Sequence, residues 1–273
     1  MGRRTVDGRG AICDFSDALA GLAYAGGMTL LLGDAARWVG RSMVRRKVRF
    51  GRKALAEQMV RVGVRSSAIV LLVQLFMGVI LALQMAPPLE PYGQESRISM
   101  IIGVAGFRML APILTAVVLS GFAGASIAAE LGTMVVAEEI EAMRAMALNP
   151  VRFLVVPRVL ATTVMLVLLA VLSDLMIALG GYLTAKLVLG PEVWRGYWER
   201  MREVLEYRDF ASGLIMAAVF GVLISLIACY EGLRVRGGAE GVGRATTMTV
   251  VYSIVAIIAA AAVFTVLFYA YGF

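Results

Sequence analysis

The sequence predicts an all-α integral membrane protein that crosses the bilayer five times. Of its 273 residues, 60% are apolar, and the mean hydropathy is +0.83, whereas soluble domains contain roughly 45–50% apolar residues. The apolar residues gather in runs of about 20 residues or more, the length that a helix needs to cross a bilayer. We therefore expect an N-terminal interfacial helix and five spans, at about residues 67–86, 110–128, 162–181, 210–230 and 249–271.

Residues 1–66 are expected to form a basic interfacial segment ahead of a membrane domain at 67–273. They hold thirteen of the 26 Lys and Arg residues and only five acids. An interfacial helix over residues 19–32 is favoured over a secretory signal, because Asp14 and Asp17 precede the apolar stretch. A nucleic-acid patch is disfavoured, because the basic run 41–53 adjoins a span and suits anionic headgroups. The basic N-terminus should be cytoplasmic, which leaves Phe273 outside after five spans.

The first two spans differ in how clearly their ends are marked. Ser67–Ala86 is an uninterrupted apolar run that Pro87-Pro88 should end. The next run, residues 98–129, would measure about 48 Å as one helix, against a hydrocarbon core of about 30 Å. Arg108 and Pro112 therefore indicate a break, with residues 98–107 at the outer surface or re-entrant and the second span beginning near residue 110.

The segment Glu130–Leu148 is too charged to cross a bilayer and predicts an amphipathic helix between the second and third spans. Val136, Ile140, Met143 and Ala147 recur at steps of four, three and four, which places them on one helix face. Glu138, Glu139 and Glu141 project elsewhere, and Asn149-Pro150 should end the helix. This pattern favours docking on another protein, and the alternative is a solvated surface helix.

The remaining spans are separated by one outer loop and one glycine-rich loop. The apolar run 153–185 is again overlong, so Pro157 and Arg158 should lie at the interface, ahead of the third span. The outer loop 187–209 carries Trp194, Tyr197 and Trp198, which suit the headgroup layer. The glycine-rich loop 231–248 follows the fourth span. It has no preceding strand and no GxxxxGK[ST] motif, so we predict no nucleotide site in this chain.

The residue inventory excludes several kinds of catalysis. The sequence has no histidine, which removes the Ser-His-Asp triad and the HExxH zinc site. Cys13 and Cys229 are expected to be buried apolar residues, and Arg108 and Asp174 to be anchors near the outer interface. Along the first span, Gly78 and a polar and methionine-rich set admit two interpretations, helix packing or a lipid-lined cavity. That set is Gln74, Met77, Leu81 and Met85.

Two blocks carry a resemblance to a known family. "GASIAAELGTMVVAEEIEAM", followed by "NPVRFLVVPRVLA", resembles the marker segment of the MlaE (YrbE) permeases, and Cys229–Thr247 resembles their second marker loop. "GVRSSAIVLL" and "GVILALQ" in the first span extend the resemblance from about Gly63 to the C-terminus. The resemblance implies a non-catalytic permease subunit of an ABC transporter that moves phospholipids or related lipids at the bacterial inner membrane.

The resemblance also implies roles for individual residues. The ATPase-coupling set is Glu130, Gly132, Thr133, Glu138, Glu139, Ile140, Glu141 and Met143. The cytoplasmic-loop set is Gly237, Gly238, Glu240, Gly241, Gly243 and Arg244. The first-span set named above would line a lipid cavity at a dimer interface, and no metal site is implied. Many relatives carry Glu, Arg and Asp where this sequence has Met109, Phe122 and Ala261, so its interior should be drier.

The implied partners are an ABC ATPase subunit that holds ATP and Mg²⁺, an MCE-domain substrate-binding protein, a small STAS-domain subunit, a second permease copy and membrane lipids. Two other classes of function compete with this interpretation. A membrane scaffold or receptor would use the acidic helix only to recruit a partner. An ion-coupled carrier is disfavoured, because few paired charges lie within the spans.

Overall fold

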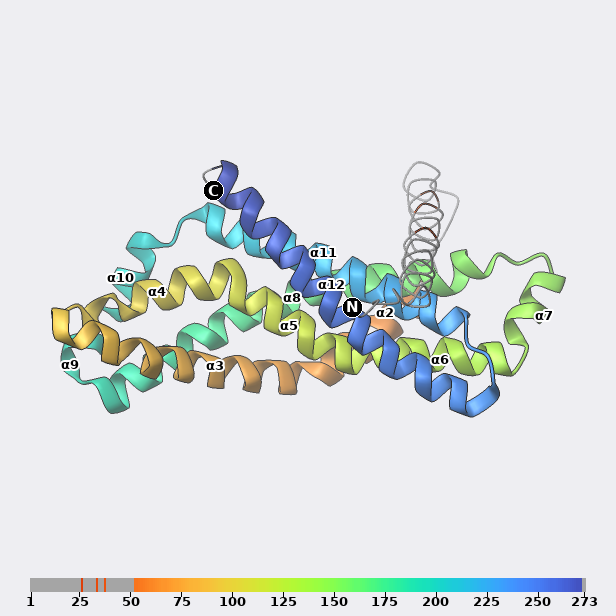
Figure 1. Cartoon of the computed structure of the whole chain (residues 1–273), viewed down its shortest axis with the longest axis horizontal. Helices are drawn as coiled ribbons and strands as arrows, with labels where there is room; N and C mark the ends of the chain where they lie inside the picture. Colours follow the sequence, from red (N-terminus) through yellow and green to blue (C-terminus); the bar gives the residue numbers. More distant parts are fainter. Residues whose placement is uncertain (1–25, 27–32, 34–36, 38–51, 272–273) are drawn as a thin grey trace, which may run out of the picture.

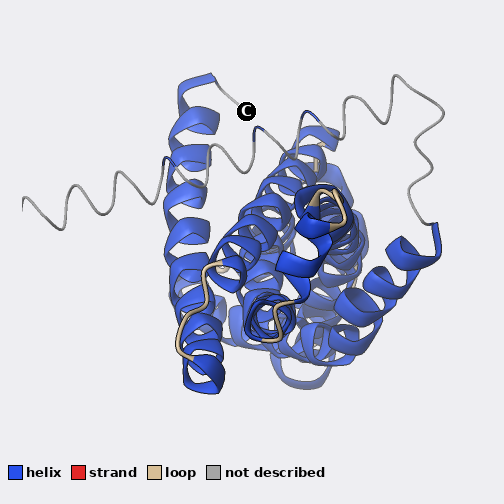
Figure 2. Ribbon diagram, turned by 90° about the vertical axis from the view of Figure 1, so that its right-hand side faces the viewer, coloured by secondary structure: helices blue, strands red, loops and turns tan. Residues whose placement is uncertain are grey.

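The computed structural model describes Gly26, Gly33, Arg37 and residues 52–271. The predicted interfacial helix, Cys13 and most of the basic run 41–53 lie outside these described residues. The described part consists of helices and turns, without a strand (Figures 1 and 2). Within it, five helical segments are long and apolar enough to cross a membrane, which confirms the predicted fold class: Leu55–Tyr92, Glu95–Val136, Val151–Leu189, Tyr207–Leu233 and Gly238–Ala270.

Several of these segments contain short π-helical or 3₁₀ turns. The first contains α2 (Arg52–Met59), η1 (Val60–Val64), α3 (Arg65–Leu89) and η2 (Glu90–Tyr92). The second contains η3 (Glu95–Arg97), α4 (Ile98–Ala105), η4 (Gly106–Leu110), α5 (Ala111–Leu119), η5 (Ser120–Gly124) and α6 (Ala125–Val136). After α7 (Glu139–Ala145), the third contains η6 (Val151–Val155), α8 (Val156–Thr184) and η7 (Ala185–Leu189). α9 (Pro191–Trp194), α10 (Tyr197–Val204), α11 (Tyr207–Leu233) and α12 (Gly238–Tyr271) complete the chain.

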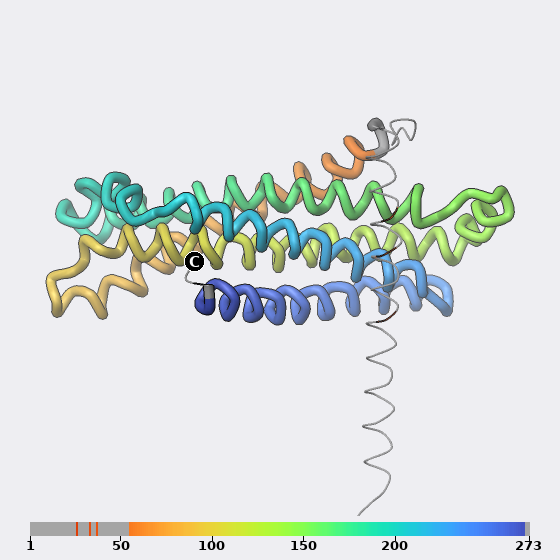
Figure 3. Tube along the Cα trace, turned by 90° about the horizontal axis from the view of Figure 1, so that it is seen from above, coloured from red at the N-terminus to blue at the C-terminus, as the bar shows by residue number. Residues whose placement is uncertain are grey.

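The long helices lie side by side in an elongated bundle (Figures 1 and 3). α7 and the turn between α11 and α12 lie at one end, here called the α7 end. α9, α10 and the turn between α3 and α4 lie at the other, the α10 end. α12 runs along the edge of the bundle. Only 17% of its most apolar stretch is buried within the chain, against 56% for the corresponding stretch of α11. One long side of α12 is therefore left for lipid or another chain.

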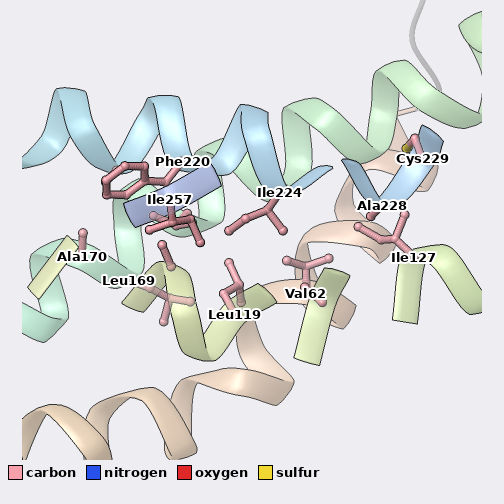
Figure 4. Close-up of a cluster of buried hydrophobic side chains, with 14 of the residues drawn as sticks. Val62, Leu119, Ile127, Leu169, Ala170, Phe220, Ile224, Ala228, Cys229 and Ile257 are labelled. Atoms are coloured by element: carbon pink, nitrogen blue, oxygen red, sulfur yellow. The ribbon is translucent and has the colours of Figure 1, made fainter. Parts of the chain in front are cut away.

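The apolar core forms where α5, α8, α11 and α12 meet. Leu119, Leu169, Phe220, Ile224 and Ile257 are buried there and point toward one another (Figure 4). The core extends toward the α7 end through a second group of side chains, Val62, Ile127, Ala228 and Cys229. Cys229 is fully buried, as the sequence predicted. Each such apolar side chain contributes about 1.5–3 kcal/mol when its burial is complete.

α3 and α8 approach closely through glycines. A Cβ atom on Gly78 would overlap the carbonyl oxygen of Ile177, and one on Gly180 would overlap that of Leu75. Next to this contact, the Gln74 amide donates to the hydroxyl of Thr115 (2.9 Å), which is 2.7 Å from the Ser173 hydroxyl. Gly78 and Gln74 thus join α3 to α8 and α5 in this chain, since small residues and hydrogen-bonded polar groups join helices within membranes.

The predicted break at Arg108 and Pro112 is wrong. The chain is helical from Glu95 to Val136 through 42 residues. The helix continues past Pro112 because the π-helical turn η4 lies just ahead of it. At this turn the Ala111 N–H donates to the carbonyl of Gly106, five residues back, and Pro112 then falls in the first turn of α5. A missing N–H costs little at that position. The segment is about 63 Å long by helical rise.

Three other predicted boundaries also shift. The domain boundary at residue 66/67 falls inside the first helical segment, which begins at Leu55. Pro87 and Pro88 lie within the last turn of α3, which ends at Leu89. The glycine-rich loop shrinks to residues 234–237, because α11 and α12 extend from both sides. The apolar cores of the five spans were visible in the sequence, whereas the polar helix ends that continue them were not.

At the α10 end, an aromatic group holds α10 against α8. Tyr197 is fully buried, and its hydroxyl donates to the carbonyl of Ala178 at 3.3 Å. Burial raises the pKa of the Tyr197 phenol. Tyr182 and Trp198 pack around it, with ring centroids 5.7 and 5.5 Å from its own. Tyr197 is therefore enclosed by its own chain, whereas Trp198 is 43% exposed.

Candidate functional site

The predicted single acidic helix is two helices, α6 and α7. α6 ends at Val136, and Glu138 then adopts a left-handed backbone with φ of 59°. A non-glycine residue held in this region costs of order 1–3 kcal/mol, which the surrounding structure must offset. The Ala142 N–H donates to the carbonyl of Glu138 at 3.0 Å, which starts α7. The turn places α7 across the end of the bundle (Figure 1).

α7 presents acids outward and anchors itself by one apolar side chain. Glu138, Glu139 and Glu141 are exposed, as the sequence predicted. Ile140 is only 4% exposed within this chain, so its own chain already buries most of its apolar surface. The large apolar residues that α7 and its flanks leave uncovered are Val136, Met146 and Leu148, at 46%, 64% and 39% exposed. The predicted shared face was wrong because the helix period is interrupted at Glu138.

Asn149 lies beyond the end of α7, which stops earlier than the sequence predicted, next to Ala147 with its left-handed φ of 58°. α7 ends at Ala145, and Asn149-Pro150 separates it from the third helical segment. The side-chain Oδ1 of Asn149 accepts from the Val151 N–H at 3.0 Å. Asparagine is suited to this because its oxygen satisfies an N–H group that a helix start leaves without an intrahelical acceptor.

The first part of the predicted coupling set lies inside the bundle. On α6, the carboxylate of Glu130 is 2.9 Å from the Arg61 guanidinium of η1 and 3.2 Å from that of Arg158 in α8. Arg158 is 4% exposed and also donates to the carbonyl of Leu154 at 3.0 Å. Glu130 therefore ties three helical segments together just inside the α7 end.

Gly132 and Thr133 also serve packing and local hydrogen bonding. A Cβ atom on Gly132 would come within 2.9 Å of the Val235 side chain, so this glycine lets α6 lie against the turn before α12. The Thr133 hydroxyl donates to the carbonyl of Glu130 at 2.8 Å. Met143, on α7, is half-buried.

The glycine-rich loop is a tight turn. Gly237 and Gly238 have φ of 90° and 68°, a backbone region that glycine adopts without strain. A Cβ atom on Gly241 would overlap the carbonyl oxygen of Arg236, so the first turn of α12 packs against the turn that precedes it. Glu240, Gly243 and Arg244 are exposed. The glycine-rich turn is thus closely packed at its base.

The two predicted blocks meet at one groove of about 740 Å³ at the α7 end. Its walls come from the end of α6, α7, the end of α11 and the start of α12. Arg144 and Glu141 contribute from α7, and Arg236 and Arg244 from the turn and α12. Two blocks whose groove residues Arg144 and Arg244 are 100 positions apart therefore form one surface, which neither block showed by itself.

A second cavity, of about 1010 Å³, lies at the α10 end and was not predicted. Its lining comes from α4, η4, α10, α11 and the C-terminal part of α12: Met100, Ile101, Val104, Ala105, Arg108, Met109, Leu110, Val204, Met216, Thr265, Phe268 and Tyr269. The only charged side chain in this lining is Arg108, whose guanidinium is 3.6 Å from the Asp209 carboxylate and 5.5 Å from the Phe268 ring centre. Arg108 thus lines a cavity.

The first-span set does not line this cavity. Gln74 is fully buried by its hydrogen bonds to α5, and Leu81 and Met85 pack partly buried against the core of the α10 end. Contact of Met77 with lipid stays a prediction. Of the positions where the resemblance implied a charge, Met109 lines the cavity, Phe122 is 38% exposed and Ala261 is buried. The cavity wall is therefore apolar at Met109, where many relatives carry Glu.

Comparisons with known proteins agree on one family. The family described as Permease MlaE matches residues 55–267. A probable ABC transporter permease protein of Rickettsia prowazekii is 36% identical over 215 residues, 79% of this chain and 83% of that protein. One of Synechocystis is 37% identical over 211 residues, 77% of this chain and 79% of that protein. The chloroplastic protein TRIGALACTOSYLDIACYLGLYCEROL 1 of Arabidopsis thaliana is 32% identical over 201 residues, 74% of this chain and 57% of that protein.

Proposed function

This chain belongs to the MlaE permease family, and from that premise we propose that it moves phospholipids or related lipids between the inner membrane and periplasmic carrier proteins. It would act as the non-catalytic membrane subunit of an ABC transporter, with ATP hydrolysis in a separate ATPase. The names of its bacterial relatives support the transporter class, and the plant relative bears the name of a glycolipid.

The observation that carries the lipid proposal is the cavity at the α10 end. Small-molecule sites are concave, mostly apolar and roughly 300–1,000 Å³ in volume, and this cavity of about 1010 Å³ suits part of a large apolar ligand. Its apolar walls suit acyl chains, and Arg108 offers a cation to a phosphate group. The absence of an acid at Met109 favours an anionic or zwitterionic lipid over a cation.

The surface of α7 supports docking of the ATPase. Exposed acids surround exposed apolar side chains, a polar rim around an apolar centre that is common in protein interfaces. Glu138, Glu139 and Glu141 supply the rim, and Val136 and Met146 the apolar part. We assign the α7 end to the cytoplasm, because the first helical segment begins in the half of the bundle nearer that end and eleven basic residues precede Leu55.

For each remaining partner we propose a binding position on the bundle. An MCE-domain protein would bind at the α10 end, where α9 and α10 project, and a STAS-domain subunit would join on the ATPase side. A second permease copy would cover the exposed apolar side of α12, where Val255, Ile258 and Val266 are each more than half exposed. The chain would bind no ATP or Mg²⁺ itself, because its glycine-rich turn lacks the phosphate-binding lysine.

Site-specific photo-crosslinking tests the lipid proposal. A photo-crosslinking amino acid at Met109, inside the cavity, should capture phospholipid in native membranes, and capture should change when ATP is added to the complex with the ATPase. The matched control is Leu72, which is 53% exposed on the outside of α3 and should show ATP-independent capture. A third probe at Met77 tests the first-span set.

Two results would count against the proposal. Equal, ATP-independent capture at Met109 and Leu72 would mean that both positions only face bulk bilayer. ATPase association without any ATP-dependent capture at Met109 or Met77 would favour the scaffold function instead.

A further inference from the structure

The groove at the α7 end is rich in arginine. Four arginines line it, Arg144, Arg234, Arg236 and Arg244, against two acids, Glu141 and Glu231. We call it the basic groove. Arg234 donates to the Tyr230 hydroxyl at 2.6 Å. The guanidinium groups of the other three arginines form no ion pair or hydrogen bond with any residue in the part of the chain that the structure describes. Their charges converge on one space from three elements.

The basic groove also has an apolar wall that continues along a membrane-spanning helix. Met248 and Tyr252 line it from α12, ten and fourteen residues after Gly238. At about 1.5 Å per residue, Tyr252 lies roughly 21 Å along the helix axis from Gly238. Tyr252 is 42% exposed. The groove therefore extends from a charged helix end toward the part of α12 that faces the bilayer.

We propose that the basic groove binds an anionic phospholipid from the leaflet at the α7 end, with the phosphate held by Arg236, Arg244 and Arg144. An acyl chain would lie along Met248 and Tyr252. Basic pockets between membrane helices on the cytoplasmic side recognise anionic headgroups. The planar guanidinium group suits a phosphate because it donates two parallel hydrogen bonds.

The apolar wall decides between a lipid and an acidic segment of a protein partner. A soluble partner could satisfy the arginines, but it would leave the membrane-facing wall at Tyr252 unused. A phospholipid matches both parts, because its phosphate and acyl chains are joined at the spacing of a headgroup and a hydrocarbon layer. The bound lipid would touch α7 through Arg144, so it would contact the helix whose outer face we assign to ATPase docking.

This site lies at the opposite end of the bundle from the cavity proposed for transport, and its occupancy requires neither transport nor the ATPase. The test therefore uses the purified full-length chain alone, in nanodiscs of equal phosphatidylglycerol and phosphatidylcholine. Native mass spectrometry of the released protein counts the lipids of each class that it retains. Loss of transport activity would refute the proposed function without affecting this result.

The test variant is Arg236→Gln with Arg244→Gln, and the control is Arg97→Gln with Arg202→Gln, which removes two exposed arginines at the α10 end. Wild type should retain phosphatidylglycerol in preference to phosphatidylcholine. The test variant should retain about tenfold less phosphatidylglycerol, while the control changes by less than about twofold. Met248→Trp, which fills the apolar wall and keeps every arginine, should cause a loss similar to that of the test variant.

Three outcomes would overturn the proposal. An equal loss in the test and control variants would indicate general attraction between basic residues and an anionic bilayer. Displacement of the retained lipid by excess inorganic phosphate would indicate a site for the free ion. Unchanged lipid retention in the test variant, together with loss of ATPase copurification, would identify the groove as a protein-docking surface.

Discussion

Glu130 and the acids of α7 belong to one sequence block, but they have different roles in the structure. Glu130 pairs with arginines of other helices, whereas the α7 acids are exposed, and substitution can distinguish these roles. Glu130 lies between Arg61 and Arg158 inside the bundle, whereas Glu139 is exposed on α7. We predict that Glu130→Ala destabilises the chain and that Glu139→Ala does not. The reason is that Arg158, 4% exposed, loses its carboxylate partner at 3.2 Å.

The magnitude follows from the burial of each partner. Breaking a fully buried ion pair by removing one charge costs about 3–5 kcal/mol. The Glu130 side chain is 31% exposed and Arg158 keeps its hydrogen bond to Leu154, so water and the backbone retain part of this energy. We expect a loss of roughly 2–3 kcal/mol for Glu130→Ala. Arg61→Ala should cost less than about 1 kcal/mol, because Arg61 is half exposed.

Equilibrium unfolding of the purified chain, by SDS titration in mixed micelles, measures these losses. Glu139→Ala, the matched exposed acid, should lie within about 0.5 kcal/mol of wild type. A double-mutant cycle of Glu130→Ala and Arg158→Ala should show a coupling of at least about 1 kcal/mol. A coupling near zero, or equal losses for Glu130→Ala and Glu139→Ala, would refute the role of Glu130 as a tie between helices.

The other predictions concern docking, packing and orientation. Reversing Glu138 and Glu141 to Lys should weaken ATPase pull-down about tenfold or more through like-charge repulsion, with stability unchanged; full association would make α7 a solvated element. Ile140→Ala should lower the free energy of unfolding by about 2–4 kcal/mol, because Ile140 is 4% exposed within its own chain, whereas Met146→Ala should lower ATPase association instead. An unchanged stability for Ile140→Ala would show that its burial contributes nothing. A reporter fused after Phe273 should be active only outside the cytoplasm, and a cytoplasmic signal would remove the proposed orientation.

Sequence reasoning succeeded where one run of residues decides the structure. Hydropathy alone located five spans, because a span depends on the local length of an apolar run. It failed at Pro112 because a π-helical turn, which no residue type specifies, keeps the helix continuous. It also grouped Glu130 with Glu138, since spacing does not show that Arg158 of another helix lies 3.2 Å from Glu130.

The apolar cavity and the basic groove could not be predicted from the sequence, for the same physical reason. The apolar cavity combines Ala105 and Tyr269, and the basic groove combines Arg144 and Arg244, pairs that only the tertiary fold brings together. Gln74 was ambiguous because a polar residue in a span can line a cavity or bond to a neighbouring helix. The hydroxyl of Thr115, 2.9 Å away, decides for the second.

ATP-driven lipid transfer in reconstituted vesicles tests the central claim most directly. The chain, its ATPase and a periplasmic carrier should move labelled phospholipid only when ATP is hydrolysed. Ala105→Trp, which fills the apolar cavity, should abolish transfer while leaving ATPase association intact, and Ala68→Trp, on the exposed side of α3, should transfer like wild type. Unchanged transfer by Ala105→Trp, or no ATP-dependent transfer by wild type, would contradict a lipid permease that works through this cavity.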